Sequence, residues 1–253
     1  MPKKILMKKN YLFPEDSYPA TDEVLISQTR KVFEAVTKSI HGNIFIINLL
    51  EKKIDYIPYL PFYISESSIQ DIKTAGLSFL RRITASEDHH ILDILKKTVI
   101  PFFNKLPIND RTKYIINFDS HIKSVEKRKI LLNYKVIPFE LDHKGNIMKA
   151  ICNLSLSLKK SSGNIQISSD VSDLLWLYNL KDEKWVKTNK KKLTYKEFDV
   201  FRYYLQGLTI PEIAEKTYLS SDTVKWHRRK LFEKLDVSNI TEALAYAVTN
   251  DLI

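Results

Sequence analysis

The sequence has few glycines and almost no cysteine. Its 253 residues include five widely spaced glycines and one cysteine, Cys152. Dinucleotide-binding turns and Walker A loops need clustered glycines that let the backbone approach a phosphate, so the composition excludes both. A single cysteine also excludes a disulfide framework and a cysteine-based zinc site. We expect Cys152 to be a small core residue.

Long apolar runs and clustered metal ligands are also missing. The longest apolar run, residues 44–50, has the length of a strand, and no window approaches the ~18 apolar residues of a membrane-spanning helix. The basic N-terminus lacks the apolar core of a signal peptide. We therefore expect a cytoplasmic protein with no membrane partner. His89 and His90 have no further ligands at helical spacing, so we expect no metal and no cofactor.

Positive charge is in excess and is concentrated in one segment. The chain has 40 Lys and Arg against 30 Asp and Glu, a net charge of +10. This excess favours an anionic partner such as nucleic acid. Residues 224–234 alone contain five basic residues and one acidic residue, Glu233. The position of the charge is therefore more informative than its total.

The first two thirds of the chain alternate between strand and helix patterns. Gly145 lies in a turn-like segment, residues 142–146, that predicts a hairpin because glycine adopts positive φ. We expect an α+β domain in which helices cover one face of an antiparallel sheet of about five strands. The predicted strands lie at 44–59 (two strands around a turn at 51–53), 113–122, 130–141 and 147–158, with a small hairpin at 176–186. The predicted helices lie at 22–40 and 65–103, the second ended by Pro101.

This order of elements, over about residues 25–160, resembles a PAS-type sensory domain. Residues 83–88 occupy the place of an I-H-P-x-D segment found in many PAS domains, although Thr84 and Ala85 replace the His and Pro. The resemblance implies that residues 1–186 form a PAS-like sensory or dimerisation domain that receives a small-molecule or protein signal. A generic α+β ligand-binding or interaction domain is the alternative. Several aromatic residues could line a pocket or simply form the core: Tyr56, Tyr59, Phe62, Tyr63, Phe79, Tyr114 and Phe118.

The last 60 residues contain repeated helix start and stop signals. A basic stretch, residues 187–192, is the predicted linker to this part. Two capping boxes predict helix starts, and Gly207 predicts the end of the first helix. Four short helices are expected, begun by Thr194 with Glu197, Thr209 with Glu212, Ser220, and Ser238, and we expect Phe198, Phe201 and Leu205 to form the apolar stripe of the first.

The third predicted helix, residues 221–235, has two different faces. Val224, Leu231 and Leu235 form an apolar stripe, and a second stripe contains Asp222, Lys225, Trp226 and Arg229. An apolar back with a cationic front and an exposed aromatic residue is what a reader of the DNA major groove requires.

The C-terminal part resembles the LuxR/GerE-type helix-turn-helix family. The order and spacing of the matching residues agree over about 60 residues without an insertion: Leu193, Thr194, Glu197, Gly207, Glu212, Ile213, Ala214, Leu219, Ser220, Thr223, Val224, Lys225, His227, Lys234, Leu235 and Val237. Pro211 departs from the pattern by standing where a Lys is common. The resemblance implies an all-α, four-helix DNA-binding domain at residues 187–253.

The resemblance also implies site residues and partners. Helix 221–235 would enter the major groove of double-stranded DNA, with Lys225, Trp226 and Arg229 at the bases. Thr223, His227 and Arg228 would contact phosphates or support the helix. The protein would be a homodimer, with Ala243, Tyr246 and Ala247 of the fourth helix at the contact.

These features predict a sequence-specific transcription regulator and not an enzyme. No Ser-His-Asp set, carboxylate pair or phosphate loop stands out, so no catalytic residue is expected. The alternative is an enzyme or protein-interaction domain with an accessory DNA-binding tail. A phosphorylation-controlled receiver domain requires alternating strands and helices, which the strand-rich run 114–158 lacks.

Overall fold

The computed structural model describes residues 31–38, 43–57, 69–124, 128–249 and 252. The chain divides into two units, residues 1–41 and 42–253. In the first unit, residues 31–38 form a helix, as predicted. The remaining residues of the helix predicted at 22–40 lie outside the described residues.

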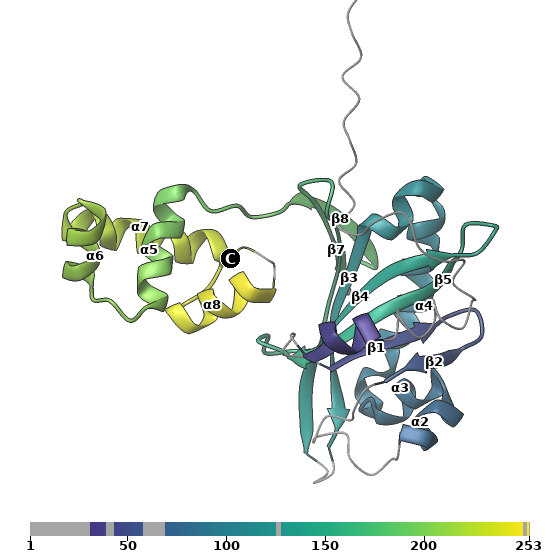
Figure 1. Ribbon diagram of the computed structural model, residues 1–253. Helices are drawn as coiled ribbons and strands as arrows, with labels where there is room; N and C mark the ends of the chain where they lie inside the picture. The colour runs from purple at the N-terminus through teal and green to yellow at the C-terminus, as the bar shows by residue number, and fades with distance from the viewer. Residues whose placement is uncertain (1–30, 39–42, 58–68, 125–127, 250–251, 253) are drawn as a thin grey trace, which may run out of the picture. The chain divides into compact units, whose positions relative to one another are not determined.

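Residues 43–189 contain an eight-stranded antiparallel sheet (Figure 1). The strand order is β2-β1-β5-β4-β3-β6-β7-β8. The predicted strands and both predicted hairpins are confirmed, while β6 was missed although Ile165 and Ile167 alternate with polar residues along it. The strands are β1 (Asn43–Asn48), β2 (Lys53–Tyr56), β3 (Tyr114–Lys123), β4 (Lys129–Leu141), β5 (Ile147–Leu156), β6 (Gly163–Ser169), β7 (Leu174–Asn179) and β8 (Lys184–Asn189).

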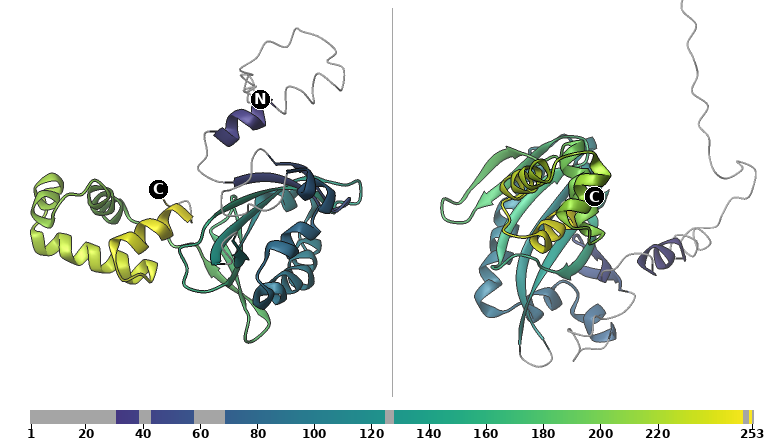
Figure 2. Two further views of the ribbon diagram at one scale, coloured as in Figure 1. Left: turned by 90° about the horizontal axis from the view of Figure 1, so that it is seen from below. Right: turned by 90° about the vertical axis from the view of Figure 1, so that its left-hand side faces the viewer.

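The α-helices that the structure describes between β2 and β3 cover one face of this sheet (Figure 2). They are α2 (Ile69–Ala75), α3 (Ser78–Ile83) and α4 (His89–Asn104). Apolar side chains from the helices and from alternate strand positions form one core. Phe79, Phe118 and Cys152 belong to this core, and burial raises the pKa of the Cys152 thiol. Tyr114 packs against its edge, whereas Tyr59, Phe62 and Tyr63 lie outside the described residues. The α+β class and the core position of Cys152 are confirmed.

The prediction that Pro101 ends a helix was wrong. Helix α4 continues through Pro101 to Asn104. Proline removes one helical hydrogen bond, but the turn that follows it carries Phe103, which is 2% exposed in the sheet core. The burial of this large side chain offsets the missing bond.

The C-terminal residues form four helices with cores of their own. They are α5 (Tyr195–Leu205), α6 (Ile210–Thr217), α7 (Ser221–Leu235) and α8 (Ile240–Thr249). Their two apolar clusters contain only residues from 193 onward, and the sheet core contains only residues before 186. Strand β8 continues to Asn189, so the first three residues of the predicted linker at 187–192 belong to the sheet.

The caps predicted for the first three of these helices are present. Thr194 and Thr209 each form a capping box, and the Ser220 hydroxyl accepts from the Thr223 N–H at 3.1 Å. Gly207 follows α5 with φ of +82°, as its predicted role at the helix end requires. The cap of α8 was misassigned, because the side chain of Asn239, and not that of Ser238, accepts from the Glu242 N–H.

A buried carboxylate connects the start of α4 to the sheet. Asp88 is 3% exposed and accepts hydrogen bonds from the His121 backbone N–H (2.6 Å), the His121 ring Nδ1 (2.9 Å) and the Ser162 hydroxyl (2.8 Å). Burial raises the pKa of Asp88, but these hydrogen bonds together lower it by more. The pKa of Asp88 therefore lies below its usual value. The ionised form of Asp88 is therefore the one that stabilises the fold.

Replacing Asp88 with alanine should destabilise the sheet domain strongly. Three donors would lose a charged acceptor, so we expect Asp88→Ala to lower the free energy of unfolding by about 2–3 kcal/mol. Urea titration followed by tryptophan fluorescence measures this, since Trp176 and Trp185 pack against the sheet core. Asp93→Ala is the control, because Asp93 forms an exposed pair with Arg81 and its loss should barely move the midpoint. Equal effects of the two substitutions would contradict the role given to Asp88.

Candidate nucleic-acid interface

Helix α7 is anchored along one side. Val224, His227, Leu231 and Leu235 are buried at the spacing of one helical face. Val224 packs in one apolar cluster with α5 and α6, and Leu231 and Leu235 pack in another with α5 and α8. Three neighbouring helices therefore hold α7, and its opposite face is left exposed.

The apolar face of α5 differs in part from the one predicted. Val200 and Phe201 are fully buried, whereas Phe198 and Leu205 are partly exposed. The predicted stripe consisted of large apolar side chains and included Phe201. In the structure, the buried side of α5 is instead the one that faces α6 and α7. The small Val200 fits there because Ile213 and Val224 lie in the same cluster.

A partly buried ion pair connects the start of α5 to the end of α7. The Lys234 ammonium lies 2.6 Å from Glu197 Oε2, and the same carboxylate oxygen accepts from the Thr194 N–H at 2.8 Å. Burial raises the pKa of Glu197, but the hydrogen bonds from Lys234 and Thr194 together lower it by more. The pKa of Glu197 therefore lies below its usual value. One carboxylate thus completes a capping box and fixes α7 against α5.

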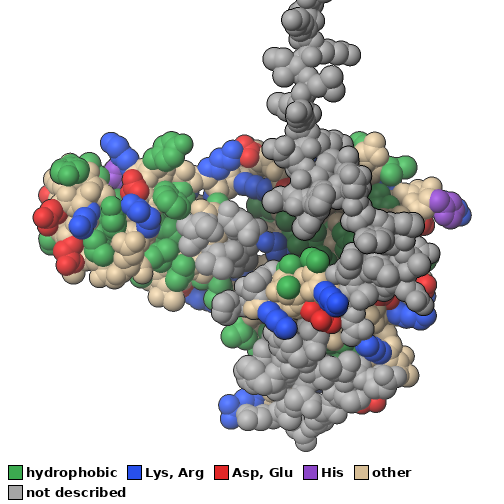
Figure 3. Space-filling model, in the orientation of Figure 1, with side chains coloured by type: hydrophobic (Ala, Val, Ile, Leu, Met, Phe, Trp, Pro, Cys, Tyr) green, Lys and Arg blue, Asp and Glu red, His purple; other side chains and the backbone are tan. Residues whose placement is uncertain are grey.

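The three residues predicted at the bases are all exposed on the outer face of α7. Trp226 is 50% exposed, and Lys225 and Arg229 are exposed beside it. Lys225 pairs with Asp222 at 3.0 Å, and no ion pair of Arg229 is found within the described part of the chain. Figure 3 shows Lys and Arg side chains among hydrophobic ones on the surface formed by helices α5 to α8. The structure brings the three predicted side chains onto one face.

The three residues predicted at phosphates have different surroundings. The Thr223 hydroxyl lies 2.8 Å from the Ser220 hydroxyl, which places it in the cap of α7. The Arg228 guanidinium lies 6.0 Å from the centre of the Tyr204 ring on α5. His227 is only 8% exposed, and the centre of its ring lies 4.8 Å from the centre of the Trp226 ring, with the two rings steeply inclined. Of the two roles foreseen for His227, the burial favours support of the helix.

Two of the three residues predicted at a dimer contact are buried within the domain itself. Ala243 and Ala247 are fully buried against Phe201, Leu231 and Leu235, so this part of the prediction was wrong. Small side chains on α8 allow it to approach α5 and α7 closely. On α8, Leu244 is a large apolar side chain that is 37% exposed.

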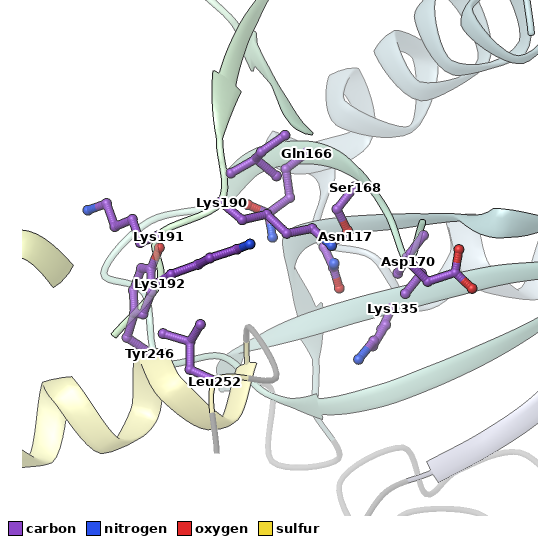
Figure 4. Close-up of a pocket in the computed structure, with 12 residues that line it drawn as sticks. Asn117, Lys135, Gln166, Ser168, Asp170, Lys190, Lys191, Lys192, Tyr246 and Leu252 are labelled. Carbon is purple, nitrogen blue, oxygen red and sulfur yellow. The ribbon is translucent and has the colours of Figure 1, made fainter. Parts of the chain in front are cut away.

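The sheet domain has a polar face opposite its helices. Asn117, Gln166 and Ser168 lie on neighbouring strands of this face (Figure 4). Asn133 donates to Asp119 there at 3.1 Å, and burial raises the pKa of Asp119 despite its hydrogen bonds. The two faces of the sheet therefore differ in chemistry.

Among the described residues, Asp88, His121 and Ser162 form the cluster that most resembles a catalytic triad, but they are not arranged as one. Ser162 and His121 both donate to Asp88, so the carboxylate lies between them and the histidine does not contact the serine. A serine nucleophile needs the histidine in the middle. His89 bonds to the backbone oxygens of Arg81 and Thr84, and no three metal-ligating side chains gather in the part of the chain that the structure describes. No described helix is long and apolar enough to cross a membrane.

Protonation of Glu197 should loosen the C-terminal domain. The folded pKa lies below the unfolded one, so the pair stabilises the domain above about pH 4.3 and is lost as the pH falls through the folded pKa. We expect Glu197→Gln to lower the free energy of unfolding by about 1–3 kcal/mol at pH 7. The difference from the wild type should shrink below pH 4, as thermal unfolding at several pH values will measure. A difference that is constant with pH would contradict the role of the charge.

Comparisons with known proteins agree with this geometry for the C-terminal segment. Residues 191–247 match the family model "GerE: Bacterial regulatory proteins, luxR family". The Fimbriae Z protein of Salmonella typhimurium is 36% identical over 61 residues, which cover 24% of this chain and 29% of that protein. The transcriptional regulatory protein LiaR of Bacillus subtilis is 36% identical over 63 residues, or 25% of this chain and 30% of that protein. The match thus spans less than a third of these relatives.

A solved structure of the Vibrio cholerae VqmA dimer, described among LuxR-type receptors, aligns over 87% of this chain and 88% of that chain. Its identity is 14% and its TM-score is 0.28, which is too low to support a shared fold. The family model, and not this alignment, establishes the family of one segment: residues 191–247 form a LuxR-family helix-turn-helix domain.

Proposed function

We propose that this protein is a sequence-specific transcription regulator whose helix α7 enters the major groove of double-stranded DNA. The observation that carries the proposal is the exposed face of α7, where Lys225, Trp226 and Arg229 lie together on a helix anchored by its other side. Lys and Arg neutralise phosphates or donate to guanine, and an indole ring packs against thymine methyl groups or sugars. The family of residues 191–247 supports the same role.

For the remaining side chains near α7, the proposal assigns different contributions. Arg228 reaches a phosphate from the side of α7 nearest Tyr204. Thr223, in the cap, contacts a phosphate at the start of the helix, where the helix dipole favours an anion. His227 holds Trp226 in place.

We propose that the sheet domain is PAS-like and receives a small-molecule or protein signal that controls DNA binding. Support comes from the contiguous order β2-β1-β5-β4-β3 and from helices α2, α3 and α4 between β2 and β3. The protein would act in the cytoplasm as a homodimer, since a two-fold protein matches the two half-sites of a palindromic operator. With Ala243 and Ala247 buried, the contact on α8 would use its exposed positions, including Leu244.

Loss of Arg229 should weaken binding to a specific operator. The operator is first obtained by selecting bound sites from random double-stranded DNA with the full chain. Arg229→Ala should then cost about 1–3 kcal/mol of binding free energy and relax the preference at one base pair, as fluorescence anisotropy on single-base variants measures. Arg202→Ala is the matched control, because Arg202 is an exposed arginine on α5 that pairs with Asp199.

The salt dependence of the same binding separates the two kinds of contact. Arg228→Ala should weaken all sequences alike and reduce the salt slope by about one, since one phosphate contact is lost. Equal affinities of Arg229→Ala and the wild type for the operator would show that α7 does not face the bases. A wild-type chain that selects no preferred sequence would contradict the proposed function itself.

A further inference from the structure

A carboxylate lies at the centre of the face that the proposed function presents to DNA. The buried positions 224, 231 and 235 define the inner side of α7, and Asp222 and Arg229 project from the side opposite to them at 100° per residue. The Asp222 side chain is 89% exposed. It belongs to the first turn of α7, the end from which a recognition helix touches base edges.

Asp222 forms an ion pair with one of the proposed base-contacting residues. Lys225 Nζ lies 3.0 Å from Asp222 Oδ1, and the Lys225 side chain is itself 51% exposed. The two residues are three positions apart, so they are neighbours on the surface of the helix. Together they present an acceptor and a donor side by side, both open to solvent.

A negative charge on this face is costly unless it meets a donor. DNA phosphates repel a carboxylate, so Asp222 lowers the affinity for DNA in general. In the major groove, the N4 amino group of cytosine donates a hydrogen bond that an Asp carboxylate can accept. The N7 and O6 atoms of guanine accept hydrogen bonds from Lys. A single C·G base pair offers these two groups next to each other.

We propose that Asp222 and Lys225 act as one unit that reads a C·G base pair. Asp222 accepts from cytosine N4, and Lys225 donates to the guanine of the same pair. Asp222 is thereby a specificity-determining residue, because it penalises every base pair that leaves its carboxylate without a donor. The inference rests on the proposed function and adds to it the base pair that is recognised at the start of α7.

A second carboxylate on α7 provides the matched control. Glu233 is exposed on the same helix and pairs with Lys230 at 2.8 Å, also with a spacing of three residues. It lies 11 positions beyond Asp222, about three turns toward the end that recognition helices direct away from the bases. Glu233→Gln removes a comparable charge and ion pair at a position where no base reading is inferred.

The test compares sites selected from random DNA by the full-length wild type, Asp222→Ala and Glu233→Gln. At one position of each half-site, the wild type should prefer C·G over the other base pairs by roughly tenfold or more. Asp222→Ala should lose that preference at that position alone and bind unrelated DNA as tightly as the wild type or more tightly. Glu233→Gln should keep every base preference of the wild type.

The outcomes separate this inference from the function on which it rests. If Asp222→Ala keeps all base preferences, or weakens all sequences equally, the carboxylate acts only on helix stability and the inference is wrong while the proposed function stands. Thermal unfolding measures that structural contribution independently, since Asp222 also lies at the favourable end of the helix dipole. If the wild type selects no preferred sequence, the proposed function itself fails.

Discussion

Burial of the apolar side of α7 is the constraint on which the orientation of its exposed side chains depends. Val224 packs with α5 and α6, while Leu231 and Leu235 pack with α5 and α8. Because a helix is rigid, fixing one side also fixes the direction of the opposite side. Lys225, Trp226 and Arg229 therefore project together from one side of the helix. The pair of Glu197 and Lys234 adds a polar connection at the far end of the same helix.

In the sheet domain, too, burial of one apolar face leaves the opposite face to polar side chains, but the element concerned is the sheet. Its apolar face is covered by α2, α3 and α4, and its opposite face carries Asn117, Asn133 and Gln166. Asp88 secures the start of α4 to β3 through charged hydrogen bonds to His121. A carboxylate in each domain thus holds a helix in place, and the buried apolar surface supplies most of the stability in both.

Local signals predicted much of the fold because local physics produces them. The capping boxes at Thr194 and Thr209, the glycine after α5 and the hairpin at Gly145 are short-range features, and all four are present. Some of the failures occurred where distant residues decide. Pro101 does not end α4 because Phe103 is buried against the sheet. The omission of β6 has no such cause, because its alternation is visible in the sequence. Ala243 and Ala247 were assigned to a dimer contact because the family resemblance implies one on the fourth helix, but both are buried inside the domain against residues of α5 and α7.

The sequence alone determined the helix boundaries around α7, the two stripes on that helix and the family resemblance of the last 60 residues, since these depend on spacing along a regular helix. The tertiary structure decided which of the predicted DNA-contacting residues are accessible. It buried His227, placed Arg228 beside Tyr204 and left Arg229 exposed. The physical reason is that exposure depends on which helix packs beside each position. Those neighbours can lie far away in the sequence, as Glu197 and Lys234 do at a separation of 37 positions.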